Sequence, residues 1–319
     1  MGTFIRSTVG AIDDDGGTPE IPALGRLLLR ALIPSPGRRR AFAAALCCPP
    51  VDPPPGRTVN VPGRGEFFVR DSGGPGPAVL LLHGWMVTAD VNWIHCYQAV
   101  IDAGYRVIAL DHRGHGRGIR PSGPFRLADC AADAAALIEA LGTGPVIAAG
   151  YSMGGPIAQL LARDRPDVVG GLVLCATAPD WRGPDFDRLW RIMGLARIVV
   201  GVAPFGFWTT MLRLNGMVDD ETAAWLIGEL GRCTPATLAQ AGRELGRFDS
   251  RPWLGELRMP AAVVVTADDR SVPPVRQRAM ADALGACVFE VAGDHLVARL
   301  PGSPFNAGLL AALAEVQPR

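Results

Sequence analysis

The feature that most constrains the fold is a regular alternation of short apolar runs with helical patterns. The apolar runs have the character of buried strands and span residues 78–82, 106–110, 145–149, 171–175, 261–265 and 287–291. Most of them are separated by helical patterns such as 127–141 and 274–284. Strands that are apolar throughout and alternate with helices form a parallel sheet covered on both faces. We therefore predict an α/β protein with a doubly wound, mostly parallel sheet.

Two segments depart from this alternation. Residues 58–61 and 66–70 are strand-like and separated by glycines, which predicts an antiparallel hairpin. Between Cys175 and Ala261, roughly eighty residues contain no convincing strand. They instead show helical patterns at 185–200, 205–214, 221–230 and 235–245. An insertion of this size predicts a helical cap, and some of its aromatic residues are expected to line an apolar pocket beneath it.

These patterns divide the chain of 319 residues into three parts. Residues 1–56 are expected to form a helical, Pro-rich N-terminal extension, and residues 57–178 and 250–319 the α/β core. Residues 179–249 are the predicted cap insertion. A chain of this length can bury a sizeable hydrophobic core.

Composition excludes several classes of partner. The chain has 31 basic and 31 acidic residues, so no basic field is available to attract nucleic acid. Its seven cysteines include no C-x-x-C pair and no cluster with histidine, so we expect neither a metal nor a cofactor. Cys175 and Cys287 lie in apolar, strand-like runs, and we expect both to be small core residues. Scattered thiols favour a reducing compartment and a cytoplasmic location. The sequence carries no signal for an oligomeric state.

We expect neither a signal peptide nor a membrane span in the N-terminal extension. Aspartates at 13–15 come first, and the leucines at 27–29 are bracketed by arginines. Residues 22–46 contain amphipathic patterns that leave two interpretations open. We favour packing against the main domain, and the alternative is contact with a membrane interface.

The pentapeptide at 150–154 carries the clearest chemical signal. It reads G-Y-S-M-G and lies between the apolar run 145–149 and the helical pattern that begins near Pro156. A G-x-S-x-G motif on a strand-to-helix turn presents the serine hydroxyl on a sharp bend. The helix that follows favours negative charge at its N-terminus. We therefore predict that Ser152 is a nucleophile.

A serine hydroxyl is a weak nucleophile and needs a base. Of the five histidines, His295 is the one that follows the strand-like run 287–291. Among the acids, Asp269 follows the run 261–265. Sites of such sheets lie at the carboxyl ends of the strands, so both side chains are candidates for the same site as Ser152. The order serine, acid, histidine is characteristic of one fold family.

With these motifs the chain resembles the α/β-hydrolase fold superfamily, in particular its serine esterases and lipases with a helical cap. The resemblance covers roughly residues 57 to 316. It is carried by L-L-H-G-W at 81–85, D-H-R-G-H-G at 111–116, G-Y-S-M-G-G at 150–155, and the segments 269–273 and 293–295. It implies that Ser152 is the nucleophile, His295 the general base and then acid, and Asp269 the carboxylate that orients the imidazole.

The resemblance also separates two adjacent acids, Asp268 and Asp269. The family commonly places its acid four residues before a proline, which here is Pro273 and selects Asp269. Asp268 remains the alternative.

Further roles implied by the resemblance concern the oxyanion hole. The backbone amides of Trp85 and Met153 are its expected donors, and His83 and Gly84 are expected to support the loop that carries Trp85. One position departs from the family pattern, because the turn that contains 111–116 usually ends with serine and this chain has Gly118.

The activity implied is hydrolysis of a small-molecule carboxylic ester with an apolar acyl group, through an acyl-enzyme intermediate. Fold relatives that open epoxides or displace halide carry aspartate at the nucleophile position, and Ser152 argues against both. An acyltransferase, a thioesterase or a C–C hydrolase with the same triad remain alternatives. C–C hydrolases rank lower, because they often have Asn where this chain has Tyr151. The last alternative is a ligand-binding protein without catalysis.

Overall fold

The computed structural model describes residues 49–183, 197–198, 200–202, 204–214 and 220–317. The amphipathic segment 22–46 lies outside the described residues, as do most of the N-terminal extension and most of the predicted helix 185–200.

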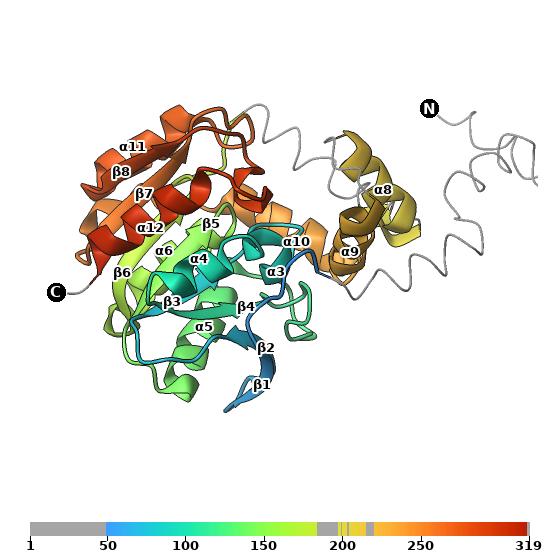
Figure 1. The fold of residues 1–319 in the computed structure, drawn as a ribbon, viewed down its shortest axis with the longest axis horizontal. Coiled ribbons are helices and arrows are strands. Elements are labelled where there is room, and N and C mark those ends of the chain that lie inside the picture. The colour runs from blue at the N-terminus through green and yellow to red at the C-terminus, as the bar shows by residue number, and fades with distance from the viewer. Residues whose placement is uncertain (1–48, 184–196, 199, 203, 215–219, 318–319) are drawn as a thin grey trace, which may run out of the picture.

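A mostly parallel sheet of eight strands forms the centre of the described part (Figure 1). Its spatial order is β1-β2-β4-β3-β5-β6-β7-β8. The pairs β1–β2 and β2–β4 are antiparallel and the other neighbours are parallel. Both the predicted sheet and the predicted hairpin are confirmed. The strands are β1 (Gly56–Val61), β2 (Gly65–Asp71), β3 (Ala78–Leu82), β4 (Arg106–Leu110), β5 (Val146–Tyr151), β6 (Val169–Cys175), β7 (Ala261–Thr266) and β8 (Cys287–Val291).

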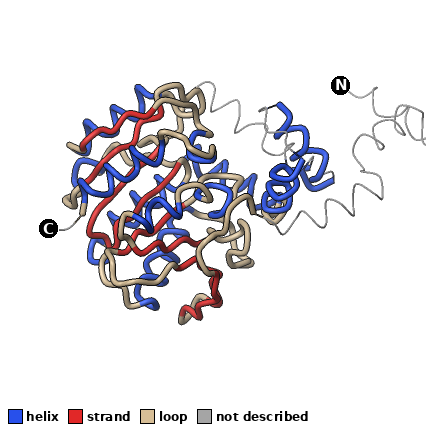
Figure 2. The backbone as a smooth tube through the Cα atoms, viewed as in Figure 1, coloured by secondary structure: helices blue, strands red, loops and turns tan. Residues whose placement is uncertain are grey.

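The central strands are buried on both faces because helices cover both faces (Figure 2). In β3, Leu80 and Leu82 belong to one hydrophobic cluster, whereas Val79 and Leu81 belong to the other. Side chains alternate across a strand, so a continuous apolar run fills two cores at once. One face is covered by α5 (Leu127–Leu141), α6 (Gly154–Asp164) and α11 (Pro274–Leu284), and the other by α3 (Ala89–Trp93), α4 (Tyr97–Asp102) and α12 (Phe305–Val316).

The edge strand β8 behaves differently from the central strands. Its Cys287 is exposed, whereas Cys175 in β6 is fully buried. The prediction of a core position is therefore confirmed for Cys175 and wrong for Cys287. A strand at the edge of the sheet has a neighbour on one side only and is covered less completely.

Three described helices lie in the insertion between β6 and β7: α8 (Pro204–Leu214), α9 (Asp220–Leu230) and α10 (Pro235–Arg247). In Figure 1, α8 and α9 project from one side of the molecule, and α10 lies between them and the sheet. Trp208 and Trp225 are almost fully buried and belong to one of the two hydrophobic clusters. Thr234 caps α10 by accepting a hydrogen bond from the Thr237 amide, and Pro235 occupies the first turn.

The sheet order sets the position of a site. The chain places β4 on one side of β3 and β5 on the other, so the loops after β3 and β5 flank the topological switch point. Leu82 at the end of β3 is registered with Gly150 in β5. Short 3-10 turns complete the fold at Pro166–Val168, Leu254–Glu256 and Val297–Arg299. No helix in the described ranges has the length and apolar character needed to cross a bilayer.

Candidate active site

Ser152 lies on a sharp turn between β5 and α6. Its backbone has a positive φ of 52°, which is unusual for a residue with a side chain. The turn closes only because its neighbours are glycines. A Cβ at Gly150 would overlap the Gly154 carbonyl, one at Gly154 would overlap the Leu82 carbonyl, and one at Gly155 would overlap the Thr177 side chain. The motif therefore holds the serine in a strained conformation that the surrounding backbone imposes.

His295 connects this serine to a buried carboxylate. Its Nε2 is 2.9 Å from Ser152 Oγ, and its Nδ1 is 2.7 Å from Asp269 Oδ2. A carboxylate only accepts hydrogen bonds, so Nδ1 carries the proton and Nε2 is free to accept the serine hydroxyl. The structure thus brings together three side chains that follow three different strands, β5, β7 and β8.

Asp269 is held by further donors besides the imidazole. One carboxylate oxygen accepts hydrogen bonds from the amides of Ser271 and Val272, both at 2.8 Å. The other accepts from Thr266 Oγ1 at 2.9 Å and from Gln277 Nε2 at 3.4 Å. These contacts fix the carboxylate, and the Asp269 side chain is fully buried. Asp268 instead accepts a hydrogen bond from the Gly293 amide at 3.2 Å, so Asp269 is the acid that meets His295.

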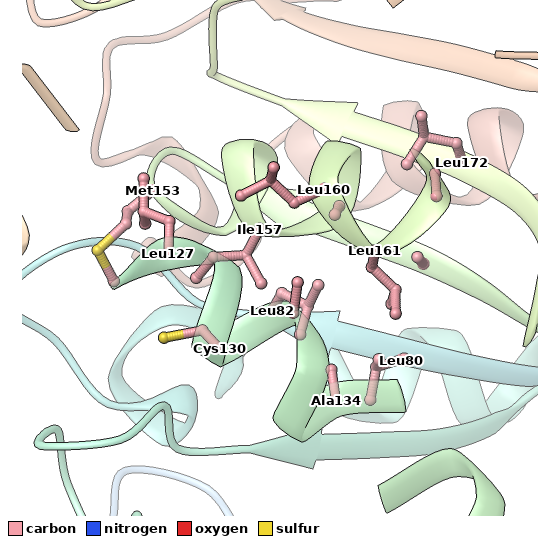
Figure 3. Close-up of a cluster of buried hydrophobic side chains, with 14 of the residues drawn as sticks. Leu80, Leu82, Leu127, Cys130, Ala134, Met153, Ile157, Leu160, Leu161 and Leu172 are labelled. Carbon is pink, nitrogen blue, oxygen red and sulfur yellow. The ribbon is translucent and has the colours of Figure 1, made fainter. Parts of the chain in front are cut away.

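The two predicted oxyanion amides belong to two segments, Met153 directly after Ser152 and Trp85 in the loop after β3. Met153 precedes the first turn of α6, and its side chain is fully buried in the hydrophobic cluster of Figure 3. Gly84 packs against the nucleophile so closely that a Cβ there would lie 3.3 Å from Ser152 Cβ. The Gly84 amide donates to Asn92 Oδ1 at 3.0 Å, which fixes the loop just before Trp85. The N-terminus of α6 directly follows Ser152 and suits developing negative charge, and the Trp85 amide stays a predicted donor.

His83 supports this loop as a neutral imidazole. Its Nδ1 donates to the Gly84 carbonyl at 2.8 Å, and its Nε2 accepts from the His112 amide at 2.9 Å. Burial, with the nearby rings of His112 and His115, holds the pKa of His83 well below its ordinary value. A neutral ring can make both hydrogen bonds, and a charged ring could not accept the second.

The turn after β4 explains the departure at Gly118. A Cβ there would overlap the carbonyl oxygens of Asp111 and His112, so this turn accommodates only glycine. His112 and His115 lie in the same turn, and the part of the chain that the structure describes contains no group of three or more His, Cys, Asp or Glu side chains arranged for a metal ion.

Some residues at the site escape sequence reasoning. Tyr151 donates its hydroxyl to the His295 carbonyl at 2.9 Å, and Gln277 reaches the carboxylate of Asp269. The signal available for Gln277 is its spacing, because it shares a buried helix face with Met280 and Ala281, three and four residues later. For Tyr151 the signal is a hydroxyl at the end of an otherwise apolar strand.

Comparison with known proteins agrees with the fold described above. Residues 77–197 match a family model described as the alpha/beta hydrolase fold. Over 124 residues the chain is 39% identical to a non-heme chloroperoxidase from Streptomyces lividans, covering 38% of this chain and 45% of that protein. Over 121 residues it is 33% identical to epoxide hydrolase B from Mycobacterium tuberculosis, covering 37% of this chain and 34% of that protein.

The structural similarity extends over more of the chain than the sequence similarity does. A thermophilic esterase from Thermogutta terrifontis, solved with malate bound, superposes with a TM-score of 0.69 at 24% identity. That match covers 83% of this chain and all of the esterase. The sequence matches to the two curated relatives above span less than half of their lengths, so what is shared with certainty is the fold.

Proposed function

Because this chain belongs to the α/β-hydrolase fold superfamily, we propose that it is a serine hydrolase that cleaves carboxylic esters with apolar acyl groups. The observation that carries the proposal is the hydrogen-bonded series Ser152, His295, Asp269, with 2.9 Å and 2.7 Å between successive partners. This arrangement gives a serine a base, and gives that base a fixed tautomer.

The reaction follows from these contacts. Nε2 of His295 takes the hydroxyl proton while Ser152 Oγ attacks the ester carbonyl, and the carbonyl oxygen becomes an oxyanion. The amides of Trp85 and Met153 are the proposed donors to that oxygen. His295 then gives its proton to the departing alcohol, leaving an acyl group on Ser152. A water deprotonated by the same imidazole releases the acid and restores the serine.

The identity of the nucleophile favours acyl chemistry among the activities of the relatives. A serine that forms an acyl ester suits the chemistry that the name of the Thermogutta terrifontis protein states, an esterase. Epoxide opening in this superfamily is associated with aspartate at this position, where the present chain has Ser152. The sequence likeness to epoxide hydrolase B therefore supports the fold more than the reaction.

We assign residues 57–178 and 250–319 to the α/β core and 179–249 to a cap that shapes the pocket for a small-molecule ester. The position of α8, α9 and α10 between β6 and β7 supports this division. The insertion is rich in aromatic residues, of which Trp181, Trp208 and Trp225 pack in the hydrophobic clusters, and an apolar insertion of this kind suits a pocket for an apolar acyl group.

The test compares the wild type with Ser152→Ala on a panel of p-nitrophenyl esters and thioesters of increasing acyl length. We expect the substitution to lower kcat by about 10⁴-fold or more. A fluorophosphonate probe should modify the wild type on Ser152, as located by mass spectrometry of peptides. Equal rates for the two proteins, or no adduct, would remove Ser152 from the mechanism. Products that form only in the presence of an added alcohol would assign the site to acyl transfer instead.

A further inference from the structure

The insertion is hydrogen-bonded to the loop that supplies the proposed oxyanion donor. We call residues 83–88, which follow β3, the oxyanion loop. The indole Nε1 of Trp85 donates to the carbonyl of Leu238 in α10 at 2.9 Å. The residue whose backbone amide is the proposed donor to the oxyanion is thus attached through its side chain to the insertion.

A second attachment lies at the other end of the loop. Thr88 Oγ1 donates to Glu229 Oε2 in α9 at 3.1 Å. Thr88 Oγ1 also accepts a hydrogen bond from the Val91 amide in α3. Glu229 is 1% exposed and accepts two hydrogen bonds from Arg117, at 2.7 Å and 2.9 Å, and one from Arg232 at 2.9 Å. A buried carboxylate with several charged partners is held firmly, because loss of any partner leaves a charge uncompensated.

The segment between these two attachments is strained. Met86 has a positive φ of 65°, a conformation that costs a residue with a side chain energy and persists only where its surroundings enforce it. Cys233, in the turn between α9 and α10, is buried with its sulfur 4.0 Å from the carbonyl oxygens of Met86 and Val87. The insertion therefore contacts the loop at the strained residue Met86, before it at Trp85, and after it at Thr88.

From these contacts we propose that residues 229–238 of the insertion position the backbone amide of Trp85, so that the oxyanion is fully stabilised only while α9 and α10 are docked on the oxyanion loop. The proposal rests on the proposed function. The indole of Trp85 thus has a positioning role, because its hydrogen bond to Leu238 fixes where the backbone amide of the same residue lies. Displacement of the insertion, for example to admit substrate, lowers catalytic power until the helices dock again.

The experiment removes the indole N–H and leaves the backbone. Trp85→Phe keeps an aromatic ring, and 3-benzothienylalanine incorporated at position 85 keeps the ring size while sulfur replaces the N–H. We expect both to lower kcat for a p-nitrophenyl ester by about 10-fold to 100-fold, somewhat less than complete loss of an oxyanion donor. KM should stay within about twofold, because a displaced amide affects the transition state more than the bound ester.

A pair of inhibitors separates this role from a packing role. A trifluoromethyl ketone is attacked by Ser152 Oγ, the hydroxyl proton passes to His295, and the former carbonyl oxygen becomes an oxyanion. The matching secondary alcohol carries the same substituents and forms no oxyanion. In both position-85 variants the inhibition constant of the ketone should rise in parallel with the fall in kcat, while that of the alcohol stays within about twofold.

Two controls complete the design. Trp253→Phe makes the same change at an indole that packs near Arg163 and outside the oxyanion loop. It should leave unchanged the inhibitor ratio, by which we mean the inhibition constant of the ketone divided by that of the alcohol. At the second attachment, Thr88→Val should lower kcat and Thr88→Ser, which keeps the hydroxyl, should restore it.

The proposal is overturned if the position-85 variants keep the wild-type inhibitor ratio, or if both inhibitors weaken equally. A wild type that the ketone does not inhibit, with hydrolysis retained in Ser152→Ala, overturns the proposed function itself and this inference with it.

Discussion

Tyr151 anchors His295 from the position next to the nucleophile, since its hydroxyl donates to the backbone carbonyl of His295 at 2.9 Å. The Tyr151 ring also packs with the ring of His295, at 5.7 Å between centroids, and with the rings of Trp93 and Phe305. Burial raises the pKa of the phenol well above its ordinary value, so the hydroxyl remains a donor. One strand end thus holds both the serine and the segment that carries its base.

We expect Tyr151→Phe to lower kcat by about tenfold with little change in KM, because small displacements of a reacting group reduce rate steeply. Steady-state kinetics on a p-nitrophenyl ester measure both constants. Tyr105→Phe is the matched control, since its hydroxyl contacts Gln317 and neither Ser152 nor His295. A Tyr151→Phe enzyme with wild-type kcat would show that the ring alone positions the histidine loop.

The two adjacent acids should differ sharply in their effect on rate. Asp269→Asn is expected to lower kcat by about 10⁴-fold, because an amide no longer selects the tautomer of His295 that accepts the serine proton. Asp268→Asn is the matched control and should stay within about threefold of the wild type, since Asp268 bonds to the Gly293 amide. Comparable losses in both variants would contradict the assignment of the acid.

The glycines of the serine turn should be intolerant of a methyl group. In Gly154→Ala the new Cβ would overlap the carbonyl oxygen of Leu82, which is backbone and cannot rotate away. We expect the free energy of unfolding to fall by about 1–3 kcal/mol or more. Urea denaturation followed by circular dichroism measures this loss. Gly123→Ala is the control, because a Cβ at Gly123 meets no atom within 4 Å, and equal stability of the two variants would contradict the prediction.

Much of the fold was predictable because its signals are local. Each central strand is an apolar run bounded by turn residues, and the turn around Ser152 needs glycines that the sequence displays as a motif. Asp269 and His295 could be chosen because carboxyl ends of parallel strands share one edge of the sheet. The prediction for Cys287 failed because an apolar run does not tell whether its strand lies at the centre or the edge.

Contacts made by the insertion were not predictable in the same way. Trp85 and Leu238 are separated by 153 residues, and Thr88 and Glu229 by 141. No periodicity specifies how helices of an insertion dock on a loop, because docking depends on complementary surfaces of both parts. Glu229 is a charged residue in an amphipathic helix, and from the sequence alone such a residue is expected on the solvent-exposed face.

The buried histidines next to the oxyanion loop should make stability depend on pH. Burial lowers the pKa of His112 to about 3 and that of His115 to about 4. In the unfolded chain both titrate near pH 6.5, so between about pH 6.5 and 4 the unfolded state binds more protons and the free energy of unfolding falls as pH falls. At pH 5 the loss is about 2 kcal/mol for each ring. Asp111, whose pKa is raised to about 6, opposes part of it.

His112→Leu isolates one of these groups. Within the described residues neither ring nitrogen of His112 has a hydrogen-bond partner, and the bond to His83 uses the backbone amide, which leucine keeps. The variant should therefore retain at least the wild-type free energy of unfolding at pH 7 and lose about 2 kcal/mol less than the wild type at pH 5. Urea denaturation at both pH values measures this difference. If the two proteins show the same pH dependence, protonation of His112 is not what destabilises the fold in acid.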